Sequence, residues 1–148
     1  MKKYILILSF FFSNCGLDNS YYYMRNFEQD QVLTTNIGDP MITSKLEYKN
    51  NVYNRVLSSS QSELIYSGKS GNVIKVVYRE FSNDFARPAF SQELQYDLNE
   101  TTTIKFKTAV MEIIKASNQE ITFKVIQSKL FKLKQGKVSK EEIEAIKQ

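Results

Sequence analysis

Short runs of β-branched and aromatic residues recur along the chain from Gln31 onward, and turn-forming Gly, Asn and Ser separate them. The clearest pair of runs is Glu63–Ser67 and Val73–Phe81, joined by the segment Gly68–Asn72. Gly and Asn tolerate positive φ, which a tight hairpin connection requires. One side of the second run is entirely apolar and consists of Ile74, Val76 and Tyr78. The pattern therefore predicts a β-hairpin with one packed face.

A second group of strands is predicted further along the chain. Apolar and polar residues alternate in Thr102–Phe106, and the apolar positions that follow shift to the other parity. A β-bulge or bend near Lys107 and Thr108 would produce this shift. The segment Thr108–Ser117 also suits helical spacing, so a helix is the alternative to the favoured strand. A turn then leads into another alternating run, Glu120–Gln127.

The other runs complete one β-rich domain over residues 31–130. Strands are predicted at Met41–Lys49 and at Ser91–Leu98. The connection between the hairpin and the second of these strands contains Phe85 and Phe90, which are expected to pack into the core. Six to eight short strands in one domain predict a mainly β fold, either a small antiparallel β-sandwich or a partly open barrel.

The C-terminal residues 131–148 differ in character and are expected to form a basic tail with a short helix. Ser139 and Glu142 have the spacing of a capping box, which predicts a helix from there to about Lys147. Because so short a helix is marginal alone, it must dock through two apolar residues, Ile143 and Ile146. The tail lysines either lie on anionic lipid or keep an exposed strand edge from pairing, and the edge interpretation is favoured.

The N-terminus has the pattern of a secretion signal. Met1, Lys2 and Lys3 give it a positive start, and the run Tyr4–Phe12 is uncharged and mostly apolar. A helix needs roughly 20 apolar residues to span a bilayer, and this run is far shorter. Residues 1–14 are therefore predicted to be a cleaved signal peptide and not a membrane anchor.

The single cysteine directly follows that run, in the sequence Phe12-Ser13-Asn14-Cys15. This segment resembles the lipobox of bacterial lipoproteins. The resemblance implies cleavage just before Cys15 and acylation of both its thiol and its new amino group. Phe12 and Asn14 depart from the commonest lipobox residues, and cleavage nearby by an ordinary signal peptidase is the alternative, although Asn14 is a poor residue for that enzyme.

Two further features extend this resemblance. Gly16 and Leu17 follow the cysteine, whereas an Asp at the first of these positions commonly retains lipoproteins at the inner membrane, so the outer membrane is implied for a Gram-negative host. The segment Tyr66–Leu98 also resembles a part of small Gram-negative lipoproteins of unassigned role, which implies no activity. Several acyl chains would make attachment to the membrane surface effectively permanent.

Residues 15–30 are expected to form a lipidated tether before the β-rich domain. This stretch is largely polar apart from three adjacent tyrosines, Tyr21, Tyr22 and Tyr23. Tyrosine suits interfaces, so the three rings could form a contact patch for a partner or for lipid headgroups. The alternative, which is favoured, is a first strand that packs one or two of the rings onto the domain.

Composition excludes several kinds of chemistry. The 148 residues include 20 Lys plus Arg against 16 Asp plus Glu, no His and one Cys. Histidine acid–base catalysis, His or Cys metal cages and an intrachain disulfide are therefore excluded. Loss of residues 1–14 removes two lysines and lowers the formal net charge from +4 to +2, which does not indicate a nucleic-acid partner. No phosphate loop or calcium loop occurs, so no catalytic residue, metal or cofactor is predicted.

The candidate binding residues are Tyr78, Arg79, Glu80 and Arg87, because Arg and Tyr are favoured at binding hot spots. The favoured alternative is an internal cluster in which the acids near this loop pair with Arg79 and Arg87. The sequence thus predicts a non-enzymatic envelope protein, held at the membrane by acyl chains on Cys15, that binds or helps assemble another envelope protein. Two other hypotheses remain, a small periplasmic inhibitor or immunity-type protein and a hydrolase with a carboxylate site.

Overall fold

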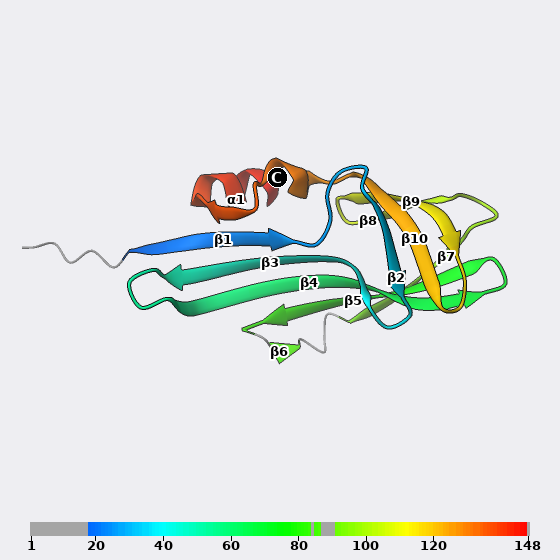
Figure 1. Cartoon of the computed structure of the whole chain (residues 1–148), viewed down its shortest axis with the longest axis horizontal. Coiled ribbons are helices and arrows are strands. Elements are labelled where there is room, and N and C mark those ends of the chain that lie inside the picture. The colour runs from blue at the N-terminus through cyan, green and yellow to red at the C-terminus, as the bar shows by residue number, and fades with distance from the viewer. Residues whose placement is uncertain (1–17, 84, 87–90, 148) are drawn as a thin grey trace, which may run out of the picture.

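In the computed structural model, the chain folds into two antiparallel sheets and a short C-terminal helix (Figure 1). The structure describes residues 18–83, 85–86 and 91–147. The strands in chain order are β1 (Asn19–Arg25), β2 (Val32–Asn36), β3 (Pro40–Asn50), β4 (Arg55–Ser70), β5 (Val73–Ser82), β6 (Phe85–Ala86), β7 (Gln92–Asp97), β8 (Thr103–Phe106), β9 (Ala109–Ala116), β10 (Glu120–Gln127) and β11 (Gly136–Val138). A 3-10 helix η2 (Lys129–Lys132) precedes β11, and helix α1 (Lys140–Lys147) follows it.

The fold class is confirmed as a mainly β sandwich with a short C-terminal helix. The larger sheet has seven strands in the order β11-β1-β3-β4-β5-β6, and β7 also pairs with β5. The smaller sheet has four strands in the order β2-β10-β9-β8. Figure 1 shows the small sheet at one end of the long strands β3 and β4, with η2 and α1 along β1. The predicted number of strands is too low, because the described residues contain eleven.

The main core lies where the small sheet packs on the large one. Every second residue of β4 and β5 points toward the small sheet, and Leu64, Tyr66, Ile74 and Val76 are almost completely buried there. The small sheet contributes Ile104, Met111, Ile121, Phe123 and Val125. The period of two in these strands places all of these side chains on the facing surfaces. Because the small sheet is short, it covers only part of the inner face of β3, β4 and β5.

The predicted hairpin is present as β4 and β5, with Gly71 and Asn72 between them. Its buried face consists of the predicted residues on β5, and β7 adds Leu94 and Tyr96 beside them. Gly71 has φ +59° in the turn, as expected. Gly68 has φ +104° inside β4, where the pairing with β5 shifts register. The positive φ at Gly68 therefore belongs to a bulge in the strand and not to the turn.

The connection at Lys107 and Thr108 is a turn that reverses the chain, and the expected bulge or bend within one strand is wrong. β8 and β9 pair antiparallel from Phe106 opposite Ala109. Lys107 has φ +49°, a left-handed conformation that such a two-residue connection needs. Reversal between Phe106 and Ala109 accounts for the shift in apolar parity. The strand predicted for the following residues is confirmed as β9.

The domain extends further at both ends than predicted. Residues 19–25, assigned to the tether, pair along their whole length with β3 and, in part, with β11. The first-strand interpretation of the three tyrosines is confirmed, with Tyr23 buried and Tyr21 and Tyr22 half-buried. At the other end, β11 adds residues of the predicted tail to the large sheet.

The capping box and the docking of α1 are confirmed. The backbone N–H of Ser139 donates to the Glu142 carboxylate at 2.7 Å, and the backbone N–H of Glu142 donates to Ser139 Oγ at 3.1 Å. Ile143 is buried, and Ile146 packs beside it in a second cluster with Tyr23, Leu133 and Val138. Docking of this short helix therefore depends on β1 and on the segment before β11.

Candidate binding groove

The uncovered end of the inner face of the large sheet carries a groove. Its floor is formed by β3 and β4, one wall by η2 and α1, and the opposite wall by β5 and the β8–β9 turn. Two adjoining cavities of about 450 Å³ and about 230 Å³ make up the groove. They share the lining residues Ser44, Ser62, Lys107, Leu130 and Ile146. This size lies within the range of small-molecule sites.

Small, polar serine side chains line the floor of the groove. Ser44 and Ser62 lie opposite each other on β3 and β4, and their hydroxyls are 2.8 Å apart in a hydrogen bond. Ser60 continues the row beside Leu46. A further hollow of about 240 Å³ begins at these two residues and runs toward Ser82. Small hydroxyl side chains between bulky neighbours on the adjacent strands leave this depression open.

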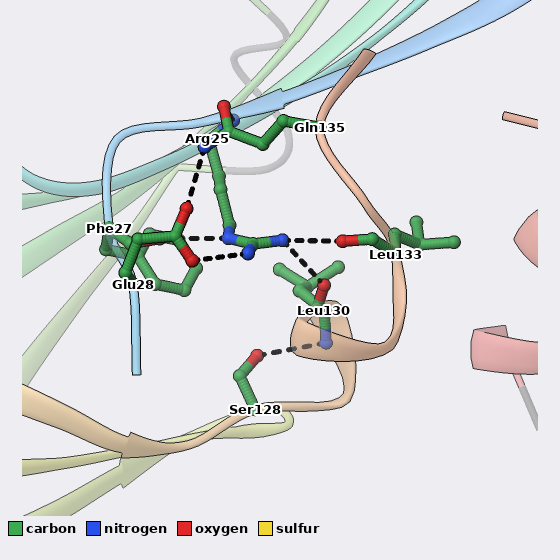
Figure 2. Close-up of polar contacts among 7 residues, drawn as sticks. All are labelled: Arg25, Phe27, Glu28, Ser128, Leu130, Leu133 and Gln135. Carbon is green, nitrogen blue, oxygen red and sulfur yellow. Dashed lines mark hydrogen bonds and ion pairs between the residues drawn. The ribbon is translucent and has the colours of Figure 1, made fainter. Parts of the chain in front are cut away.

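The helix-side wall is held in place by Arg25 at the end of β1 (Figure 2). Its guanidinium donates to three backbone carbonyls, those of Phe27 at 2.9 Å, Leu130 at 3.1 Å and Leu133 at 2.7 Å. It also forms an ion pair with Glu28 at 2.6 Å. The Arg25 side chain is only 8% exposed, so these bonds are largely shielded from water. The fork of donors on one arginine therefore joins the loop after β1 to η2.

Further hydrogen bonds complete this connection. Ser128 caps η2 by accepting from the backbone N–H of Leu130 at 3.2 Å. The Gln135 side chain donates to Glu28 at 2.8 Å and accepts from the backbone N–H of Arg25 at 3.3 Å. Hydrogen bonds from Arg25, and then from Gln135, lower the pKa of Glu28, so this carboxylate stays charged. The network positions Leu130 and Leu133, which line the groove.

The opposite wall contains a cluster of Tyr78, Glu80 and Lys107. Lys107 Nζ lies 2.9 Å from the Glu80 carboxylate and 4.0 Å from the centroid of the Tyr78 ring, and the Tyr78 hydroxyl bonds to both charged groups. Burial, and then the hydrogen bond to Glu80, raise the pKa of Tyr78. Burial lowers the pKa of Lys107, but its bonds to Tyr78 and Glu80 outweigh this effect and raise it. Tyr78 therefore stays neutral and Lys107 stays charged, which suits a cluster that fixes the β8–β9 turn over the groove.

Tyr23 lies beside Arg25 and lines the larger cavity together with Leu133 and Ile143. It is only 3% exposed, and its hydroxyl oxygen is sealed from solvent. Burial raises the pKa of Tyr23, while the charge of Arg25 and a hydrogen bond with it act in the opposite direction. Tyr23 therefore contributes to the groove through its ring.

The structure brings together only some of the residues predicted from sequence. Tyr78 and Glu80 lie on the same side of β5 and share Lys107. Arg79 lies between them in sequence and is exposed on the other face, opposite Glu63 on β4. Glu80 and Arg79 therefore do not face each other, because neighbouring residues of a strand point to opposite faces. Arg87, like the Phe90 expected to pack into the core, lies outside the described residues.

Several groove residues have no counterpart in the sequence prediction. The alternation of Ser58, Ser60 and Ser62 was the available signal for the floor, since a period of two places them on one face. No comparable signal marks Arg25, whose carbonyl partners at Leu130 and Leu133 lie more than 100 residues away. For Lys107, the sequence predicts only a place in a bulge or bend.

Two further kinds of feature are absent from the described residues. Within residues 18–83, 85–86 and 91–147, no group of three or more acidic, Cys or His side chains is placed to hold a metal ion. In that part of the chain, no helix has the length and apolar character to cross a membrane. Cys15 lies outside it, so its lipidation stays a prediction. No protein-family model, curated protein or solved structure matches the chain.

Proposed function

We propose that this protein is an exported, non-enzymatic binding protein, held at a membrane surface through acyl chains on Cys15, whose groove takes a small amphiphilic ligand. The observation that carries the proposal is the pair of adjoining cavities, of about 450 Å³ and about 230 Å³, between an apolar wall and a floor that contains serine hydroxyls. A binding site commonly combines an apolar lining with a few convergent polar groups. The groove has both components.

The lining defines the chemical class of the ligand. The helix-side wall consists of apolar side chains, with Leu46, Leu130, Leu133, Ile143 and Ile146 around the cavity. The floor offers the serine hydroxyls of Ser44, Ser60 and Ser62. We therefore expect a ligand with an apolar body and at least one hydrogen-bond acceptor.

Filling the floor of the groove should abolish ligand binding. Ser62→Phe places a ring between the two cavities, since Ser62 lines both. The probe is 1-anilinonaphthalene-8-sulfonate, an apolar ring system with a sulfonate acceptor, and its fluorescence reports binding to the chain from Gly16 to Gln148. We expect Ser62→Phe to lower the affinity for this probe by about tenfold or more, equivalent to about 1.4 kcal/mol. The matched control is Ser70→Phe, an exposed position at the far end of the same strand. Equal binding by both variants and the unaltered chain would count against the groove.

The lipid anchor has an independent test. Cells that produce the full chain or its Cys15→Ser variant are grown with radiolabelled palmitate, and the protein is then isolated. We expect label in the unaltered protein and none in the variant, because the thiol and the adjacent amino group would be the acceptors. Equal labelling of the two proteins would disprove the anchor without bearing on the groove.

A further inference from the structure

The turn between β3 and β4 concentrates exposed apolar side chains. Eight large hydrophobic residues in the described part of the chain are exposed, and four of them lie at this turn or on the first residues of β4. Their exposed fractions are 65% for Val52, 76% for Tyr53, 44% for Val56 and 45% for Leu57. Clustered apolar exposure of this kind marks a surface that contacts another molecule or a membrane.

The same turn lies where the folded domain begins. Asn19 pairs with Asn50, and the backbone N–H of Asn51 donates to the carbonyl of Asp18 at 2.8 Å. Figure 1 shows the start of β1 and the β3–β4 turn at the same end of the molecule, opposite the β4–β5 turn. Cys15 precedes Asp18 by three residues, which span at most about 11 Å even when fully extended. A membrane anchor at Cys15 would therefore hold the turn within reach of the lipid headgroups.

We propose that the β3–β4 turn is a membrane-contact hairpin, which enters the interfacial region of the bilayer beside the acyl chains. This inference rests on the lipid anchor of the proposed function. Tyr53 at the tip suits the interface, where an aromatic ring meets lipid and its hydroxyl meets water. The aliphatic side chains of Val52, Val56 and Leu57 would gain by burial at the boundary of the acyl chains.

Charge at the turn is compatible with an anionic surface. Arg55 lies between Tyr53 and Val56 and is exposed. A basic residue close to an anionic leaflet adds electrostatic attraction. Contact through both the acyl chains and the turn would fix the orientation of the domain, with β3 and β4 directed away from the bilayer and the β4–β5 turn farthest from it.

Depth-dependent fluorescence quenching tests this orientation. The chain contains no Trp, so Tyr53→Trp introduces a single indole at the tip, where an exposed side chain tolerates the change. The matched control is Ile37→Trp, also at an exposed apolar position. Ile37 lies beside Gly68, since a Cβ added to Gly68 would be 3.1 Å from Ile37 Cδ1. Gly68 is eleven residues from Leu57 along β4, so the control position lies about 35 Å from the tip. Both variants, in their acylated form, are reconstituted in vesicles of phosphatidylcholine and phosphatidylglycerol, with or without bromine on the acyl chains.

We expect brominated lipid to quench Trp at position 53 and to shift its emission to shorter wavelength, with neither effect at position 37. If the protein floats with the vesicles but Trp at position 53 is not quenched, the hairpin proposal is overturned and the anchor stands. Equal quenching at both positions also overturns it, since the tip would have no special contact. Failure of the acylated chain to float with the vesicles overturns both proposals.

Discussion

Replacing Arg25 by Met is expected to reduce the free energy of unfolding by about 3 kcal/mol, because charged hydrogen bonds contribute about 1.5–3 kcal/mol each and buried carbonyls lose their donor. Methionine keeps the apolar stem of the arginine but supplies no N–H group. The carbonyls of Phe27, Leu130 and Leu133 would then lie in a largely buried region without their present partner. Urea unfolding followed by circular dichroism measures the change.

Arg55→Met is the matched control for this substitution, since Arg55 is exposed at the start of β4 and its loss should change stability little. Arg25→Lys should recover only part of the lost stability, because one ammonium group cannot reproduce the forked geometry of the guanidinium. Equal stability of Arg25→Met and Arg55→Met would show that the Arg25 network does not hold the groove wall. A destabilised Arg25→Met should also bind 1-anilinonaphthalene-8-sulfonate more weakly, because Leu130 and Leu133 line the groove.

Replacing Tyr66 by Phe is expected to reduce the free energy of unfolding by about 1–3 kcal/mol, because a buried backbone carbonyl loses its donor. Tyr66 is completely buried, and its hydroxyl donates to the backbone carbonyl of Ser117. The ring keeps its packing in the main core. Thermal unfolding measures the change.

Tyr23→Phe provides the contrast within the same fold. The Tyr23 hydroxyl is also buried, but it donates to no backbone carbonyl. The ring keeps its packing against Leu133, Val138 and Ile143. Tyr23→Phe should therefore cost less stability than Tyr66→Phe, and equal losses would contradict this difference.

The interactions that the sequence predicts correctly are short-range ones. The period of two in Ile74, Val76 and Tyr78 gives the buried face of β5, because alternation along a strand depends on backbone geometry alone. The capping box at Ser139 and Glu142 is likewise complete within four residues. These local patterns determine the fold class, the central hairpin and the position of the C-terminal helix. They also lead to the prediction that Cys15, which lies outside the described residues, is acylated.

Only the tertiary structure decides which strands lie side by side and which polar groups meet. Glu80 contacts Lys107 from the other sheet and not its sequence neighbour Arg79, because adjacent side chains on β5 point to opposite faces. Arg25 reaches the carbonyls of Leu130 and Leu133, which lie more than 100 residues away. Such contacts depend on the register and packing of distant segments, and no local pattern of residues encodes that information.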